Sequence, residues 1–294
     1  MKNLTIIILI FCATNIFSDD HLLSSNLFFF GAGPSWSNFD QVTTYDYKSD
    51  TSMKLKNQYK INIANGYQIS TFIYLNIHKY VSPFIQYINA GINGGNGFVK
   101  SVNTRTNEVV EYYNFLPQAK SNYFAIGNYA QIYQTKYSDI DFYFYFFAGY
   151  NISTIHTVAK WEDDTSFSDS TWYGAALGFA TNFSLNDKIS FWIEDDFYPD
   201  RIKTCSTRDS VIGEEGGYES LILFSNYISG TCIYQLPKIP NASLGISLCY
   251  GYYTKVGQVD IKLAQSDQQL FTNPKVNCEK GNYGVLLFDI FVTF

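Results

Sequence analysis

Large apolar residues alternate with small or polar residues over long stretches, and this period of two limits the possible folds more than any other feature of the sequence. The stretch "ASLGISLCYGYY", residues 242–253, shows it most clearly. One set of positions is apolar: Ala242, Leu244, Ile246, Leu248, Tyr250 and Tyr252. The positions between them are small or polar: Ser243, Gly245, Ser247, Cys249 and Gly251. Because successive side chains of a strand point to opposite faces, this stretch predicts a strand with one oily face.

The same split recurs in the middle of the chain. In "TWYGAALGFATNF", Leu177 and Phe179 fall on one face and Gly178 on the other. In "DFYFYFFAGYN", phenylalanines alternate with the tyrosines Tyr143 and Tyr145. A tyrosine hydroxyl can reach water while its ring is packed, so we expect the tyrosines on the wetter face. Helical periodicity is hard to find anywhere, which predicts an all-β protein.

The connections between the alternating segments are short and long in turn. Short ones are expected near Ile77–Lys79, Tyr137–Ile140, Asn186–Lys188 and Pro237–Asn241. Long polar ones are expected over Ser37–Lys56, Asn93–Lys120, His156–Ser170, Asp200–Gly217 and Gly257–Asn282. This order is typical of an antiparallel up-and-down transmembrane β-barrel, with tight turns at one rim and long loops at the other.

About ten strands are expected between these connections. They are Ser25–Trp36, Gln58–Asn76, Tyr80–Ile92, Ser121–Gln134, Asp141–Ile155, Thr171–Leu185, Ile189–Pro199, Tyr218–Gln235, Ala242–Val256 and Tyr283–Phe294. The segment Gln58–Asn76 contains "NGYQ", which could be a hairpin turn, so eight or twelve strands are alternatives. No linker, charge block or internal repeat divides the chain, and we expect residues 19–294 to form one barrel domain.

Residues 1–18 are expected to be a secretory signal peptide. Lys2 gives a short positive region, Leu4–Phe11 an apolar region, and the Ser18–Asp19 junction a small-residue cleavage site. The apolar run is shorter than the roughly 20 residues that a membrane-spanning helix needs. Acylation at Cys12 is a weaker alternative, because the bulky Phe11 precedes it.

The composition separates a membrane barrel from its soluble alternative, a secreted β-sandwich. Aromatic residues make up 18% of the chain and charged residues only 16%, well below the average for soluble proteins. A sandwich hides its apolar faces between two sheets and keeps its outer faces polar. Long aromatic strands with sparse charge therefore favour the membrane barrel. The net charge of −6, without a basic cluster, argues against a nucleic-acid partner.

With its signal peptide, alternating strands, alternating loop lengths and the final segment "GVLLFDIFVTF", the chain resembles bacterial outer-membrane β-barrel proteins. The resemblance implies a location in the bacterial outer membrane, with its lipid and its barrel-assembly machinery as partners. It also implies an assembly signal in the last strand. The matching positions are Leu286, Phe288, Ile290, Val292 and Phe294. Asp289 stands close to where that family usually has a glycine, and we expect its side chain to face inward.

Ten strands also make the chain similar in topology to the omptins, which are outer-membrane proteases, and to the opacity-type adhesins. The resemblance to omptins implies a site with an Asp-x-His element. Of the histidines His21, His78 and His156, only His21 follows an aspartate at that spacing, and it lies directly after the expected cleavage site and not in a predicted long loop. The protease activity is therefore not carried over.

Acidic residues cluster in three places, and one cluster falls within a predicted strand. In "IEDD", Glu194 and Asp196 share the face opposite Ile193 and Phe197, which points them into the barrel lumen. Such a pair could bind a cation or act as acid and base. The favoured interpretation is a polar lumen that pairs them with Arg201 or Lys203. The remaining clusters, Glu162–Asp164 and Glu214–Glu215, match no calcium-loop motif, so neither metal nor cofactor is expected.

Four cysteines remain after residue 18, and an exported protein can form disulfides. Cys232 and Cys249 flank the Pro237–Asn241 turn almost symmetrically and could be cross-strand neighbours. Cys205 and Cys278 fall in predicted long loops at one rim and could join them. In an organism without a periplasmic oxidase all four would be thiols. No Cys-x-x-Cys motif indicates a zinc or redox site.

Three functions remain open, and the first is favoured. It is an integral outer-membrane barrel, adhesin-like or structural, whose long loops meet a host or environmental ligand. The second is a narrow channel for small solutes, although ten strands enclose little space once side chains fill it. The third is an omptin-like surface hydrolase, for which the sequence shows no nucleophile–base constellation. We therefore expect a protein that is not an enzyme.

Overall fold

The computed structural model describes residues 27–48, 54–161, 164–199, 201–209, 215–222, 224–239, 242–255, 259–260 and 272–293. These residues form fourteen strand segments. They are β1 (Leu27–Lys48), β2 (Lys54–Tyr74), β3 (Ser82–Asn93), β4 (Gly97–Asn103), β5 (Val109–Tyr137), β6 (Ile140–Trp161), β7 (Asp164–Asn186), β8 (Ile189–Tyr198), β9 (Arg201–Asp209), β10 (Glu215–Ile222), β11 (Phe224–Gln235), β12 (Ala242–Lys255), β13 (Val259–Asp260) and β14 (Thr272–Thr293). The signal peptide predicted at residues 1–18 lies outside the described part of the chain.

The segments form ten strands of one closed antiparallel barrel, as the sequence predicts. Four strands are interrupted and appear as the pairs β3/β4, β8/β9, β10/β11 and β12/β13. For example, β2 pairs with β3 at Gly66↔Ile92 and with β4 at Ile61↔Gly97. When each interrupted pair is counted as one strand, every strand pairs antiparallel with the next strand in the chain. The barrel closes where β14 pairs with β1, from Phe29↔Thr293 onward. The "NGYQ" stretch lies within β2 and forms no hairpin.

The strands are much longer than the sequence predicts, and most residues of the predicted long loops belong to them. β1 continues to Lys48 instead of ending at Trp36, and β5 begins at Val109 instead of Ser121. Apart from the β4–β5 hairpin, these extensions are mostly polar on their outer side, and the sequence therefore predicts loops there. Backbone pairing does not require an apolar face, so the ladders continue beyond the apolar part of each strand. β5 has 29 residues, far more than the roughly 9–11 that cross a bilayer.

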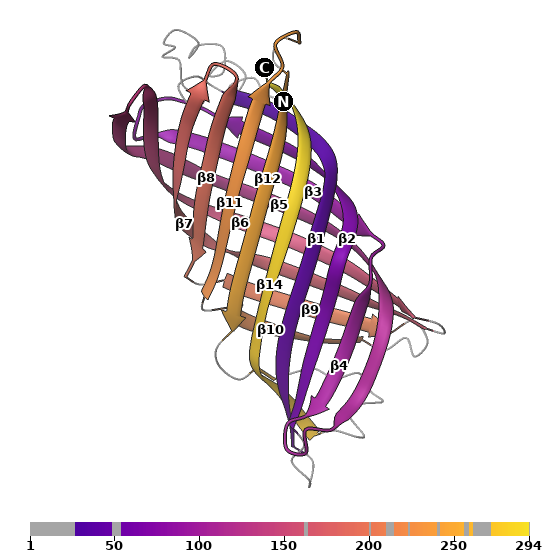
Figure 1. The fold of residues 1–294 in the computed structure, drawn as a ribbon. Coiled ribbons are helices and arrows are strands. Elements are labelled where there is room, and N and C mark those ends of the chain that lie inside the picture. The colour runs from indigo at the N-terminus through magenta and orange to yellow at the C-terminus, as the bar shows by residue number, and fades with distance from the viewer. Residues whose placement is uncertain are drawn as a thin grey trace, which may run out of the picture.

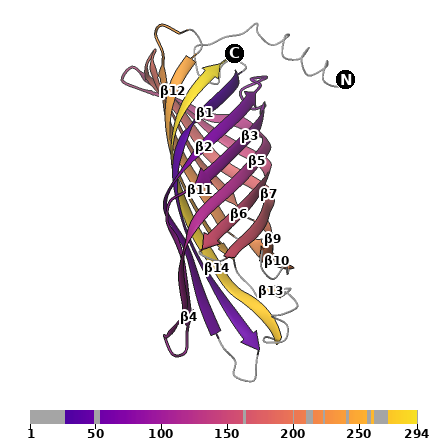
Figure 2. The same cartoon turned by 90° about the vertical axis from the view of Figure 1, so that its right-hand side faces the viewer.

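The barrel is a tall, tilted cylinder with two different rims (Figures 1 and 2). β1 begins and β14 ends at one rim, which also has the short turns after β2, β5, β7 and β11; we call it the turn rim. β1, β2, β4, β5 and β14 extend furthest at the opposite rim, the distal rim. The described residues contain no helix that is long and apolar enough to cross a membrane.

The outer wall has a continuous set of exposed apolar side chains, which we call the apolar belt. It comprises Phe30, Ile69, Ile85, Ile126, Phe179, Ile193, Ile228, Ile246, Leu248, Phe288 and Ile290. Towards the distal rim, the belt ends on three strands at the exposed aromatic residues Trp36, Tyr67 and Tyr252. Exposed tyrosines also lie near the turn rim, at Tyr80, Tyr133 and Tyr137. An apolar band between two rows of aromatic residues is the arrangement of barrels that span a lipid bilayer.

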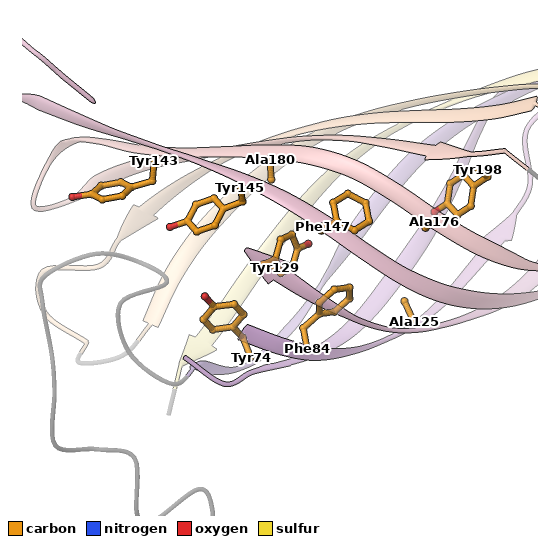
Figure 3. Close-up of a cluster of buried hydrophobic side chains, with 10 residues drawn as sticks. All are labelled: Tyr74, Phe84, Ala125, Tyr129, Tyr143, Tyr145, Phe147, Ala176, Ala180 and Tyr198. Atoms are coloured by element: carbon orange, nitrogen blue, oxygen red, sulfur yellow. The ribbon is translucent and has the colours of Figure 1, made fainter. Parts of the chain in front are cut away.

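The inner wall has two different halves. Aromatic side chains from β2, β3, β5, β6 and β8 gather on one side, where Tyr74, Phe84, Tyr129, Tyr145 and Phe147 form one buried cluster (Figure 3). Small polar side chains line the other side: Ser35, Ser70, Ser225, Ser229, Thr231, Ser243 and Ser247. The sequence predicts this inward direction for Tyr143 and Tyr145, and both are buried inside the barrel.

Phe291 of β14 fills the space that two glycines leave on its neighbouring strands. A Cβ atom built on Gly245 of β12 would lie 1.9 Å from Phe291 Cε2. One built on Gly31 of β1 would lie 2.7 Å from Phe291 Cδ1. The Phe291 ring therefore fits only because both neighbouring strands have a glycine beside it.

Candidate functional site

A cavity of about 1500 Å³ lies inside the barrel. Its walls include Asp139, Asp187 and Lys188 near the turn rim, and Gln41 and Asn57 towards the distal rim. The alternation of the strands explains its chemistry, because most of the large aliphatic side chains point outward, whereas serine, asparagine, acidic and many aromatic side chains point inward.

Glu194 of β8 is the best-connected acidic residue in the cavity. The Tyr129 hydroxyl donates a hydrogen bond to Glu194 Oε1 at 2.6 Å. The Trp192 indole N–H donates to Glu194 Oε2 at 3.0 Å. Both donors belong to the aromatic half of the inner wall, and the rings of Tyr129 and Trp192 meet edge to face at 5.6 Å. Two hydrogen bonds and a packed aromatic surround fix the position of this carboxyl group.

Asp196 lies two residues further along the same strand and faces the same lumen. Its side chain is only 7% exposed. The Tyr198 hydroxyl donates to Asp196 Oδ2 at 3.3 Å, whereas Asp196 Oδ1 is buried without a hydrogen-bond partner. The carboxyl groups of Asp196 and Glu194 also interact with each other electrostatically. The cavity thus contains two adjacent acidic groups, and one oxygen atom remains unused.

The charge inside the cavity is strongly unbalanced. Among the described residues that line it, six are acidic: Asp139, Asp141, Asp187, Glu194, Asp196 and Asp289. In the same lining the only basic side chain is that of Lys188, near the turn rim. The sequence interpretation paired Glu194 and Asp196 with Arg201 or Lys203, whose side chains lie outside the described residues. No group of three or more metal-ligating side chains occurs in the described part of the chain.

A second candidate site lies on the outside of the barrel, on the β4–β5 hairpin at the distal rim. Four outward side chains form an apolar surface there, which we call the tip patch: Phe98, Val110, Tyr112 and Leu116. Val110, Tyr112 and Leu116 are each more than half exposed. The rings of Phe98 and Tyr112 stack at 5.8 Å.

A polar band separates the tip patch from the apolar belt. On the outer face of β5, Gln118 and Lys120 lie between Leu116 of the patch and Phe124, which is exposed at the level of the belt. On the neighbouring strands the band continues with an ion pair, in which His156 Nδ1 and Asp169 Oδ1 are 2.7 Å apart. Because charged side chains are unfavourable among lipid chains, the tip patch lies outside the bilayer.

The interior of this projecting end has a core of its own. Ile61, Ala64 and Phe115 are buried there, and Phe39 and Tyr59 pack against them. Burial raises the pKa of the Tyr59 phenol well above its ordinary value, and the neighbouring Tyr113 adds to the effect. Trp172 of β7 and Tyr253 of β12, two strands that do not pair with each other, meet edge to face at 4.8 Å, with Phe39 beside them. The β4–β5 hairpin is therefore held in place by a packed interior.

Cys232 and Cys249, which the sequence suggests as cross-strand neighbours, do not lie opposite each other. Cys232 pairs with Ile246, and Cys249 pairs with Ser229, three residues away along the ladder. Cys249 lines the cavity, whereas Cys232 alternates with the inward residues Thr231 and Ile233 and therefore faces outward. The two cysteines lie at nearly equal distances from the turn, but they are offset by three residues along the ladder. Because this offset is odd, their side chains point to opposite faces of the sheet. Both are free thiols.

The other two cysteines lie in strands and not in loops. Cys205 belongs to β9 and Cys278 to β14. The side chains of both lie outside the described residues, so a bond between them stays a prediction. The acidic residues Glu162, Asp163 and Glu214 also lie outside the described part.

The last strand has the two faces that the sequence predicts. Leu286, Phe288 and Ile290 are exposed on the outer wall, and Asp289 is 4% exposed and lines the cavity. Val292 is half-buried, and Phe294 lies outside the described residues. Recognition of these positions by an assembly machinery stays a prediction.

Sequence reasoning missed the partners of the acidic pair. Tyr129 comes from a strand that is not adjacent to β8, so only the closure of the barrel brings it to Glu194. Trp192 and Tyr198 could have been found, because they lie at positions i − 2 and i + 2 of Glu194 and Asp196 on the same inward face.

No family model matches the sequence, and no curated protein matches it. Solved structures do match. The outer-membrane protease OmpT from Escherichia coli aligns with a TM-score of 0.66 and 10% identity, over 94% of this chain and 99% of that one. The transport unit of the autotransporter AIDA-I from Escherichia coli aligns with a TM-score of 0.38 and 11% identity, over 97% and 96%. At such identity the first of these likenesses concerns the fold alone. The fold is that of the outer-membrane β-barrel proteins, as predicted.

Proposed function

We propose that this ten-stranded barrel of the outer-membrane type is a surface-binding protein, held in the bacterial outer membrane by its apolar belt. The belt and its two rows of aromatic residues support the location in lipid. The projecting distal rim supports the binding role, because it carries the β4–β5 hairpin and the tip patch well beyond the belt.

The tip patch is the observation on which the binding role rests. Single exposed apolar residues are ordinary on any protein, but a contiguous exposed patch indicates an interaction site. Here the polar band around Gln118 and Lys120 separates the patch from the lipid-facing surface. Its stacked Phe98 and Tyr112 rings offer the aromatic contact area that protein and glycan interfaces use.

The proposal includes no hydrolytic role. Among the described residues, the histidine–aspartate pair of His156 and Asp169 is exposed on the outer wall, whereas Glu194 and Asp196 line the lumen. A nucleophile and its base must lie within hydrogen-bond reach of each other and of the substrate. The arrangement therefore supports a binding protein better than an enzyme.

The test uses cells that display the full chain, probed with a glycan array and with immobilised fibronectin, collagen and laminin. We expect binding to at least one of these probes, and its loss in the double variant Tyr112→Ser/Leu116→Ser. Asn114→Ser changes the same outer face of β5 and is the matched control. Heat-modifiable migration on a gel confirms that each variant folds. Equal binding by the control and the double variant would contradict the role of the patch.

A narrow channel is the second candidate, and the cavity favours it because its lining includes residues near both rims. Against it, the aromatic cluster near Tyr129 and the one around Trp172 and Tyr253 narrow the lumen at two levels. Refolded protein in a planar bilayer separates the two candidates. A surface-binding barrel gives no steady single-channel currents, whereas a channel does.

A further inference from the structure

We propose that the lumen contains a binding site for a small organic cation, with an ammonium or guanidinium group held between Asp196 and Glu194. The site is independent of the tip patch, and neither proposal requires the other. It rests on the position of these two acidic groups and on the aromatic rings around them.

The unused oxygen of Asp196 is the first argument. Asp196 is more than nine-tenths buried and belongs to the lining of the cavity, and its Oδ1 atom has no hydrogen-bond partner. A buried acidic oxygen without a donor is costly, and a donor from a ligand would remove that cost. The hydrogen bonds from Tyr129 and Trp192 fix Glu194 beside it, so the site is preorganised.

The charge of the lining is the second argument. A ligand entering from the turn rim would pass Asp139, Asp141 and Asp187 before it reached Asp196. Field lines in a low-dielectric cavity concentrate, so acidic walls raise the local concentration of cations. Asp289 of β14 and Cys249 of β12 line the same cavity.

The aromatic surround favours an organic cation over a metal ion. On the wall that holds Glu194, the Tyr129 ring lies within 6.4 Å of the rings of Trp192, Tyr145 and Phe147, centroid to centroid, and the Tyr145 ring lies 5.8 Å from that of Trp192. Ammonium and guanidinium groups bind over aromatic faces, most favourably over tryptophan. No group of three metal-ligating side chains occurs among the described residues. The donors present therefore suit one N–H-bearing cation.

The experiment measures binding of agmatine, which has one guanidinium and one ammonium group, to the refolded full chain in detergent micelles. Calorimetry and intrinsic tryptophan fluorescence report binding, and 1,4-butanediol serves as the uncharged probe. We expect saturable binding of agmatine and none of the diol. Asp196→Asn should weaken agmatine binding at least tenfold, because it removes one charge-assisted hydrogen bond. Glu194→Gln should weaken it as well.

Asp195→Asn is the matched control, since Asp195 stands between the two acids but is exposed on the outer wall, where it accepts a hydrogen bond from Asn226. This variant should bind agmatine as the unchanged protein does. Heat-modifiable migration shows that each variant folds. Failure of the unchanged protein to bind agmatine overturns the proposal. It would indicate that the two carboxyl groups are stabilised by a shared proton and not by a ligand. Equal weakening by Asp195→Asn and Asp196→Asn also overturns it, because general charge would then explain the binding.

Discussion

The Tyr129 hydroxyl donates a hydrogen bond of 2.6 Å to Glu194 Oε1 across the interior of the barrel. Tyr129 belongs to β5 and Glu194 to β8, and β6 and β7 lie between these strands in the wall. The bond therefore connects parts of the barrel that the backbone ladder does not pair directly.

Replacing Tyr129 by phenylalanine should destabilise the barrel and leave its fold intact. The change removes a hydrogen bond to a buried acidic group, which costs about 1.5–3 kcal/mol in the free energy of unfolding. Urea unfolding of the refolded protein in micelles, followed by tryptophan fluorescence, measures this. Tyr145→Phe is the control, since it removes a hydroxyl from the same aromatic wall and should cost much less. Equal losses for the two variants would contradict the importance of the bond to Glu194.

Replacing Gly245 by alanine should destabilise the barrel, because the added Cβ would lie 1.9 Å from the Phe291 ring. Overpacking of this kind costs about 1–3 kcal/mol. Gly230→Ala is the matched control on the neighbouring strand β11, since a Cβ there meets nothing within 4 Å. The second change Phe291→Leu should restore part of the loss. If Gly245→Ala were as stable as Gly230→Ala, the packing of Phe291 would be different from the one described.

A charge introduced on the apolar belt should impair folding far more than the same charge in the lumen. Ile246→Arg points toward lipid and should cost about 2–4 kcal/mol if it lies near the middle of the bilayer. Ser247→Arg, one residue further along β12, points into an acidic lumen and should cost less. The fraction that refolds into lipid vesicles, measured by heat-modifiable migration, compares the two. A larger loss for Ser247→Arg would reverse the assignment of the two faces.

The Cys249 thiol should react faster with a cationic thiosulfonate reagent than with an anionic one of similar size. Its side chain lines the same cavity as the acidic residues Glu194, Asp196 and Asp289. Mass spectrometry of the Cys249 peptide after timed labelling measures both rates. The double variant Glu194→Gln/Asp196→Asn should bring the two rates closer together. A preference for the anionic reagent in the unchanged protein would contradict an acidic lumen.

The sequence predicts the barrel well because period two is a local property that the closed fold preserves. Leu244, Ile246 and Leu248 are exposed on the outer wall, and Ser243, Gly245 and Ser247 are buried, as their alternation indicates. The number of strands follows from the same pattern.

Strand length and the surroundings of the site could not be predicted in the same way. Most strand extensions beyond the belt lack the regular alternation of large apolar and small or polar residues, so nothing distinguishes them locally from loops. β1 from Ser37 to Lys48 is an example. The partners of Glu194 depend on which strands face each other across the lumen, a relationship that closure creates and no single segment encodes. The inward direction of Glu194 itself is a local property.

The most direct test of the barrel and its two faces is a cysteine scan along β12, from Ala242 to Lys255, with a spin label attached at each position in turn. Electron paramagnetic resonance in lipid vesicles measures the accessibility of each label to oxygen, which concentrates in lipid, and to a water-soluble nickel complex. We expect oxygen accessibility to peak at residues 244, 246, 248 and 250 and to fall at the residues between them. Accessibility without a period of two, or with water-soluble access at both faces, would contradict a membrane-spanning barrel.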